Sequence, residues 1–110
     1  MKQATLVYCV QNGSILLGMK KRGFGKGKLN GYGGKAHEGE NMAAAAIREL
    51  QEEANLIASE VNLEKAAEID FHFIDVPEES GWGQTVHVYL LKEWKGEPEE
   101  TEEMKPEWYN

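Results

Sequence analysis

Hydrophobic and polar residues follow one another along the first twenty positions in a pattern that predicts a β-hairpin. Residues 4–10 (ATLVYCV) are rich in β-branched and aromatic side chains, which is typical of a mostly buried strand. Asn12-Gly13 is the preferred pair for a type I′ turn, so the strand predicted over 14–19 runs back antiparallel. Cys9 is expected to face the core, because free cysteines are among the most buried residues.

Two further strands are predicted in the second half of the chain. Residues 68–74 alternate apolar with charged or polar side chains, which predicts a strand with one buried face. Residues 84–94 are predicted as another strand, and residues 56–66 as a connection without regular structure. An acidic run over 99–103 is expected to follow the last strand.

A single helix is predicted between the glycine-rich first third of the chain and these strands. It is expected to begin at a cap formed by Asn41 and to end near Asn55, since asparagine tolerates the left-handed conformation that ends many helices. At about 100° per residue, four apolar side chains fall on one narrow stripe: Ala43, Ile47, Leu50 and Ala54.

Three carboxylates crowd the neighbouring face of this helix. Glu49, Glu52 and Glu53 lie within about one turn, so their side chains are neighbours. At about 4 Å each pair costs roughly 4 kcal/mol at an effective dielectric near 20, and only about 1 kcal/mol in bulk water. The cluster therefore indicates a helix face that is either well solvated or occupied by cations.

A glycine-rich and basic segment precedes the helix. Residues 20–34 contain six glycines, whose backbone amides can approach a ligand closely, although such loops are also merely flexible. Five of the twelve basic residues lie in nine positions of this segment: Lys20, Lys21, Arg22, Lys26 and Lys28. A basic loop beside an acidic cluster suits a small polyanion held together with divalent cations; the alternative is a lysine-rich solvated loop.

Length and charge narrow the possibilities further. The 110 residues are the size of a single domain (1–110), and the net charge of −7 argues against a nucleic-acid partner, which needs a broad basic surface. No apolar run approaches the roughly 18 residues of a membrane span and no signal-peptide pattern opens the chain, so no membrane partner is expected. A single cysteine cannot form an intramolecular disulfide, which fits a cytoplasmic protein.

The stretch over 34–56 resembles the Nudix box, G-x5-E-x7-R-E-U-x-E-E-x-G-U, in which U is a bulky aliphatic residue. Eight positions match at the fixed spacing: Gly34, Glu40, Arg48, Glu49, Leu50, Glu52, Glu53 and Leu56. Asn55 replaces the second glycine, a mild change because that position requires a left-handed residue rather than a ligand.

The flanking segments extend the resemblance over nearly the whole chain. GMKKRGFGKGKLNGYGGK (18–35), FHF (71–73), VHVY (86–89) and EEMKPEWY (102–109) are similar to the MutT-type oxidised purine nucleoside triphosphatases. This resemblance implies an α+β fold, the α/β/α sandwich of the Nudix proteins, with a mixed β-sheet and the Nudix-box helix. It also implies that the C-terminal helix of the family is absent, so that the chain is a short form of the domain.

The resemblance also implies a set of metal ligands. These are the carbonyl group of Gly33 and the carboxylates of Glu49, Glu52, Glu53 and Glu103. Glu53 is the first choice for the essential ligand, and Glu52 and Glu103 are the candidates to activate the attacking water. For Glu103, membership of a solvated acidic run is an equally good explanation. The expected cation is Mg²⁺, with Mn²⁺ as a substitute.

Arg48 is expected to orient the glutamates by ion pairing, and Glu40 is interpreted as a structural cap rather than a ligand. Lys20 and Lys35 are expected to contact phosphates, and Asn30 to hydrogen-bond to the purine edge. The full set of substrate-binding positions implied by the resemblance is Thr5, Lys20, Phe24, Asn30, Tyr32, Gly33, Gly34, Lys35, Phe71 and Trp108. For Phe71, plain core packing is the alternative.

The predicted function is that of a Mg²⁺-dependent pyrophosphohydrolase that acts on a small-molecule nucleotide. It converts purine nucleoside triphosphates, with oxidised ones such as 8-oxo-dGTP favoured, to the monophosphate and pyrophosphate. One alternative is a Nudix hydrolase of another nucleoside diphosphate derivative, such as ADP-ribose or a dinucleoside polyphosphate. Another is a catalytically idle nucleotide-binding module. A homodimer is expected if the sheet face that the missing helix would cover stays apolar.

Overall fold

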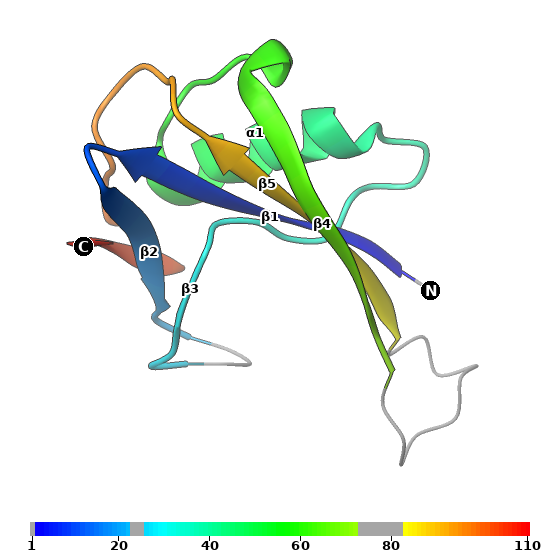
Figure 1. Ribbon diagram of the computed structural model, residues 1–110. Coiled ribbons are helices and arrows are strands. Elements are labelled where there is room, and N and C mark those ends of the chain that lie inside the picture. The colour runs from blue at the N-terminus through cyan, green and yellow to red at the C-terminus, as the bar shows by residue number, and fades with distance from the viewer. Residues whose placement is uncertain (1, 23–25, 73–82) are drawn as a thin grey trace.

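The computed structural model describes residues 2–22, 26–72 and 83–110 (Figure 1). Phe24, one of the predicted substrate-binding residues, lies outside the described residues, as does the end of the strand predicted over 68–74. Among the described residues, no helix is both long and apolar enough to cross a membrane.

One mixed sheet contains the strands of the described residues. They are β1 (Lys2–Gln11), β2 (Ser14–Lys20), β3 (Leu29–Asn30), β4 (Leu63–Phe71), β5 (Gln84–Leu91) and β6 (Met104–Tyr109). The order across the sheet is β3-β2-β1-β5-β4, and β6 pairs with β2. β1 and β5 are parallel, whereas the other strand pairs are antiparallel. The mixed sheet of an α+β protein is thus confirmed.

The local predictions for the hairpin and the helix are confirmed. Asn12 and Gly13 have φ angles of 52° and 80°, as a type I′ turn between β1 and β2 requires. The helix α1 (Met42–Ala54) begins at Asn41, whose side chain accepts hydrogen bonds from two backbone amides of the first turn. It ends at Asn55, which is left-handed with φ 57°.

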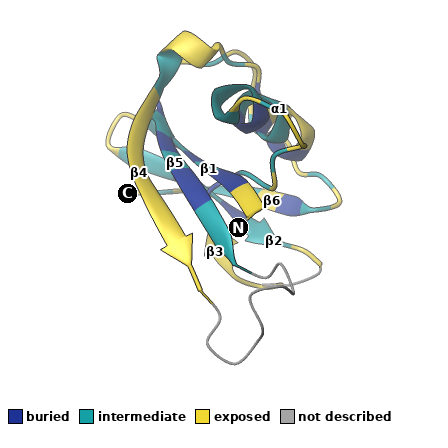
Figure 2. Ribbon diagram, turned by 90° about the vertical axis from the view of Figure 1, so that its right-hand side faces the viewer, coloured by how far each residue is buried: buried dark blue, intermediate teal, exposed yellow. Residues whose placement is uncertain are grey.

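The core lies between α1 and one face of the sheet (Figure 2). Leu50 from the helix packs there with Val7 and Cys9 of β1, Leu16 of β2 and Leu91 of β5, and none of these five side chains is exposed. Cys9 therefore faces the core, as predicted. Full burial of one such leucine stabilises the fold by about 1.5–3 kcal/mol, so these contacts hold α1 firmly against the sheet.

β1 changes its pairing partner along its length, and this brings the glycine-rich segment into the sheet. Its last residues pair with β2, whereas Ala4 and Val7 form bridges with Lys35 and Tyr32. The segment just before α1 is therefore fixed to the central strand, directly beside the helix that carries the glutamates.

Residues 56–66 are not simply a connection, because they contain a 3₁₀ turn, η1 (Glu60–Asn62), and the first residues of β4.

The burial predicted for the strand over 68–74, which corresponds to β4, is wrong. β4 is exposed along almost its whole length (Figure 2), with Ile69 43% and Phe71 48% exposed. Alternation predicts a buried face only where a second layer covers the strand, and β4 is an outer strand that α1 does not cover.

The end of the chain also differs from the prediction. β5 ends at Leu91 rather than at residue 94, and residues 104–109 form β6. Glu103 therefore precedes the last strand of the described residues instead of following it. The charged residues and Pro106 make this segment look unlike a strand in the sequence. Proline is nevertheless tolerated on edge strands, and among the described strands β6 pairs with β2 alone.

Candidate active site

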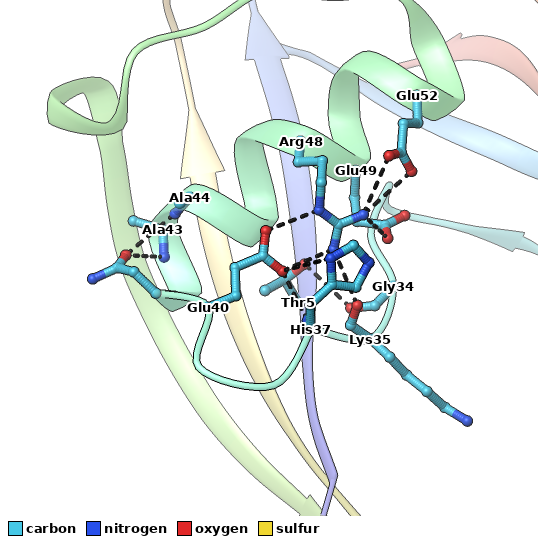
Figure 3. Close-up of polar contacts among 11 residues, drawn as sticks. Thr5, Gly34, Lys35, His37, Glu40, Ala43, Ala44, Arg48, Glu49 and Glu52 are labelled. Atoms are coloured by element: carbon cyan, nitrogen blue, oxygen red, sulfur yellow. Dashed lines mark hydrogen bonds and ion pairs between the residues drawn. The ribbon is translucent and has the colours of Figure 1, made fainter.

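Arg48 organises the carboxylates on the exposed side of α1 (Figure 3). Its Nε and Nη2 atoms each donate to one oxygen of Glu40, both at 2.9 Å. Its Nη1 atom donates to Glu49 at 2.9 Å and to both oxygens of Glu52 at 3.3 Å. The guanidinium thus lies between Glu40 and the two helix glutamates. The ion pairs expected of Arg48 are present, and its role in orienting the glutamates stays a prediction.

Both carboxylate oxygens of Glu40 accept hydrogen bonds. Besides its paired contact with Arg48, it accepts a hydrogen bond from the backbone N–H of His37 at 2.8 Å. The hydrogen bonds from Arg48, followed by that from His37, lower the pKa of Glu40 to about 2. Arg48 also donates to the carbonyl oxygen of Lys35 at 3.3 Å. The pair therefore joins α1 to the preceding segment, which fits the structural interpretation of Glu40.

Glu53 stands apart from the other glutamates because it is buried. Its side chain lies toward the sheet with 9% exposure, and Oε1 accepts a hydrogen bond from the N–H of Gly33 at 2.9 Å. Burial is the main cause that raises the pKa of Glu53 to about 7, and the charges of Glu49 and Glu103 add to it. In the described part of the chain, no lysine, arginine or histidine forms a salt bridge with Glu53.

Close packing explains the two glycines before the helix. A Cβ atom at Gly33 would lie 1.8 Å from the carbonyl oxygen of Thr5, and one at Gly34 would lie 2.7 Å from the carboxylate of Glu49. Thr5 is buried, and its backbone N–H donates to the carbonyl oxygen of Gly34 at 2.9 Å. At Gly33 the contact is with the backbone of β1, which cannot move aside, whereas at Gly34 it is with the movable end of the Glu49 side chain.

Glu103 acts on the same region, because its charge contributes to the raised pKa of Glu53. Nε and Nη2 of Arg22 donate to its Oε1 atom at 2.9 and 2.7 Å, and Nη2 also contacts Glu102 at 3.2 Å. The hydrogen bond from Arg22 lowers the pKa of Glu103. The charge of Lys20 favours the ionised forms of both Glu53 and Glu103. Glu103 and the helix glutamates therefore share one electrostatic environment.

The sequence did not single out Arg22. The signal was present, since a basic run over 20–22 and an acidic run over 99–103 carry opposite charges. The two runs meet only because β2 and β6 pair, with Lys20 opposite Met104. Lys21 takes part in the same contact, because its Nζ atom donates to Glu100 at 2.7 Å.

Tyr32 and Asn30, two of the predicted substrate-binding residues, differ in exposure, because Tyr32 is buried whereas Asn30 is exposed. Tyr32 is completely buried in the core, and its hydroxyl has no hydrogen-bond partner among the described residues. Asn30 accepts hydrogen bonds at 2.9 Å from both the hydroxyl of Tyr8 and the N–H of Gly31. Their contacts with a substrate stay predictions.

Three further candidates have side chains that form no hydrogen bond or ion pair with the carboxylates among the described residues. Lys35 is exposed, and its side chain extends away from Arg48 (Figure 3). Phe71 ends β4, and Trp108 stacks on Trp94 with ring centroids 6.1 Å apart. The structure therefore couples Glu53 electrostatically to Glu49, Glu103 and Lys20. The roles of Lys35, Phe71 and Trp108 stay predictions.

The oxygen donors of this region fit a divalent cation. Within the described residues, no three acidic, histidine or cysteine side chains form a ready-made metal site. In this arrangement Arg48 pairs with Glu49 and Glu52, and Arg22 pairs with Glu103. Hard carboxylate oxygens are nevertheless the ligands of Mg²⁺-like ions, and Glu53 is a buried carboxylate that forms no salt bridge with the described residues. These residues would hold the ion that the resemblance implies.

The mixed sheet and the carboxylate-bearing helix define the class of protein. Residues 1–110 match the family described as NUDIX domain, and the chain belongs to the Nudix family. The crystal structure of a MutT NUDIX hydrolase from Burkholderia pseudomallei matches with a TM-score of 0.82 and 24% identity, covering 98% of this chain and 81% of that one. The predicted family and fold are therefore confirmed.

Two relatives from animals are considerably more similar in sequence. The oxidized purine nucleoside triphosphate hydrolase of Danio rerio is 47% identical over 109 residues, which cover 99% of this chain and 66% of the relative. The protein of that name from Mus musculus is 46% identical over 105 residues, which cover 96% and 64%. The chain thus spans about two thirds of the length of these relatives.

Proposed function

We propose that the chain is a Mg²⁺-dependent pyrophosphohydrolase of purine nucleoside triphosphates, with oxidised ones such as 8-oxo-dGTP favoured. The observation that carries this proposal is Glu53, a buried carboxylate on the Nudix-box helix that forms no salt bridge with the described residues and has a raised pKa. The activity named for the relatives from Danio rerio and Mus musculus supports the choice of substrate. We further propose that residues 1–110 act as one domain, in the cytoplasm, where the free and buried Cys9 stays reduced.

The proposed chemistry is the addition of water to a phosphorus atom of the substrate. The new P–O bond forms as the bridging P–O bond breaks, and the products are the monophosphate and pyrophosphate. Glu49, Glu52, Glu53, Glu103 and the carbonyl group of Gly33 would hold the cation. When bound, Mg²⁺ neutralises phosphate charge and lowers the pKa of water, and Mn²⁺ is expected to substitute for it. Glu52 or Glu103 would accept the proton of the attacking water.

The proposed substrate contacts place the phosphates near Lys20, whose charge already acts on the carboxylates. Asn30 offers a side-chain amide to the edge of the base. The other proposed contacts are those implied by the family: Thr5, Phe24, Tyr32, Gly33, Gly34, Lys35, Phe71 and Trp108.

The test is release of pyrophosphate from 8-oxo-dGTP and dGTP with Mg²⁺, and of AMP from ADP-ribose. We expect turnover of the triphosphates, a higher kcat/KM for 8-oxo-dGTP than for dGTP, and loss of turnover when EDTA removes the metal. Faster cleavage of ADP-ribose would instead identify a hydrolase of nucleoside diphosphate derivatives. Nucleotide binding without any turnover would identify an idle binding module.

We also propose that the chain forms a homodimer through the sheet face turned away from α1. Leu6, Val88 and Leu90 are half-buried on this face, and Ile69 and Phe71 are exposed beside them. Among the described residues no helix covers these side chains. Apolar patches of this kind are usually covered in soluble proteins, and pairing of two copies is a common way to cover them.

Light scattering across a range of protein concentrations tests the dimer. We expect a species of twice the chain mass of 12.4 kDa at high concentration. Ile69→Lys should shift the equilibrium to monomer, because it places a charge in the paired face. Val61→Lys is the matched control, since Val61 is 87% exposed and lies on η1 outside this face. A strictly monomeric wild type would contradict the proposal.

A further inference from the structure

Thr101 links the Nudix-box helix to the segment that carries Glu103. Its Oγ1 atom donates to the carbonyl oxygen of Glu53 at 3.1 Å. The same atom accepts hydrogen bonds from the N–H groups of Glu103 at 3.3 Å and Met104 at 3.2 Å. A threonine hydroxyl offers one donor and two acceptor sites, so all of its capacity is used here.

The link lies at the C-terminal end of α1, where helix carbonyl groups lack partners within the helix. Thr101 satisfies the carbonyl group of Glu53, and the N–H of Glu99 satisfies that of Ala54 at 2.9 Å. Asn55 at the end of the helix also donates a side-chain hydrogen bond to Glu99. Residues 99–101 therefore form the cap of the helix, and this cap leads directly into Glu103.

The hydroxyl of Thr101 lies between the backbones of two predicted metal ligands, Glu53 and Glu103. The backbone of Glu53 and the backbone of Glu103 are each one hydrogen bond away from the same oxygen atom. The carboxylates themselves repel each other, as shown by the effect of Glu103 on Glu53. Arg22 also restrains Glu103, but its side chain is 60% exposed, and exposed ion pairs contribute little.

We propose that Thr101 is a positioning residue that sets the spacing between Glu53 and Glu103 for binding of a divalent cation. This inference rests on the proposed function, in which both glutamates hold the metal. Thr101 itself touches neither metal nor substrate in this role. Residues behind metal ligands orient them, and their loss commonly weakens metal binding by about 10–100-fold.

The test compares Thr101→Val with Thr101→Ser. Valine keeps the shape of the side chain and removes all three hydroxyl hydrogen bonds, whereas serine keeps the hydroxyl. We expect Mn²⁺ binding to the metal-free protein, measured by electron paramagnetic resonance, to weaken about tenfold in the valine variant and to be nearly unchanged in the serine variant. In the hydrolysis assay, the Mg²⁺ concentration for half-maximal rate should rise by a similar factor, with kcat largely recovered at saturating Mg²⁺.

Asn41→Ala is the matched control for a general loosening of the helix. Asn41 caps the opposite end of α1 with hydrogen bonds of 2.9 and 3.2 Å and contacts none of the proposed ligands. It should lower the unfolding midpoint without changing Mn²⁺ affinity. The inference would be overturned if wild type and Thr101→Val bound Mn²⁺ equally well. It would also be overturned if Asn41→Ala or Thr101→Ser lost as much Mn²⁺ affinity as Thr101→Val. Neither result would affect the proposed function. A wild type that neither binds Mn²⁺ nor hydrolyses nucleotides would overturn the proposed function and the inference with it.

Discussion

Replacement of Glu53 by glutamine is expected to lower kcat for triphosphate hydrolysis by at least about a hundredfold. Loss of a residue that only orients a metal ligand costs about 10–100-fold, so loss of the ligand itself should reach or exceed the upper end. Glutamine retains an oxygen that can accept the hydrogen bond from Gly33, but it lacks the charge that would bind the cation. Steady-state release of pyrophosphate at saturating Mg²⁺ measures the effect.

The same substitution should stabilise the metal-free protein at neutral pH, which separates loss of chemistry from loss of fold. The pKa of Glu53 is raised to about 7 in the folded protein and is close to 4.5 when the chain is unfolded. Between these values the folded state binds more protons, so the free energy of unfolding falls as pH rises from about 4.5 to 7. Glutamine cannot ionise, so it removes this loss of stability, which amounts to about 3 kcal/mol above pH 7.

Urea unfolding in EDTA at pH 5 and pH 8 measures this difference. Wild type should lose stability between the two pH values relative to Glu53→Gln. Full activity of the glutamine variant would refute the role of Glu53 in metal binding. A variant that is less stable than wild type at pH 8 would show that the charge of Glu53 is compensated in the folded protein.

Replacement of Gly33 by alanine should destabilise the fold by about 3 kcal/mol or more, among the larger effects seen for single substitutions. The new Cβ would lie 1.8 Å from the carbonyl oxygen and 2.5 Å from the carbonyl carbon of Thr5. Both atoms belong to the backbone of the central strand β1, so neither can rotate away. The segment would have to leave β1, which breaks the hydrogen bond between Thr5 and Gly34.

Gly27→Ala is the control for this prediction, and the urea midpoint is the measurement. Gly27 has a φ of 85° and nothing within 4 Å of an added Cβ. Alanine there meets only the cost of a left-handed conformation, about 1–2 kcal/mol. If Gly33→Ala lost no more stability than Gly27→Ala, the close contact with Thr5 would not be a real constraint on the fold.

Local signals explain which parts of the fold the sequence predicted. The turn at Asn12-Gly13 and the caps at Asn41 and Asn55 depend on the conformational preferences of single residues, and all three are present. The spacing of the Nudix box depends on helix geometry, which places Arg48 beside Glu52 one turn later. Each of these features is decided within about one helical turn of chain.

Contacts between distant segments explain what the sequence did not predict. The exposure of β4 depends on whether another layer covers it, and that is not encoded in its alternating pattern. The contact of Arg22 with Glu103 and the linking role of Thr101 both depend on where β6 pairs. The burial of Tyr32 in the core depends on its bridge with Val7, 25 positions away, and was not indicated by its place in the glycine-rich segment.

The position of β6 also determines the order in which the site can form. The β1–β2 hairpin and α1 need only neighbouring residues, whereas Arg22 and Glu103 are separated by 81 positions and Lys2 pairs with Gln84. Contacts of such long range slow folding because a large loop must close before they form. A growing chain therefore contains the segment with Glu49, Glu52 and Glu53 before Glu103 has been synthesised. We therefore expect the proposed carboxylate ligands to come together only once β6 has joined β2.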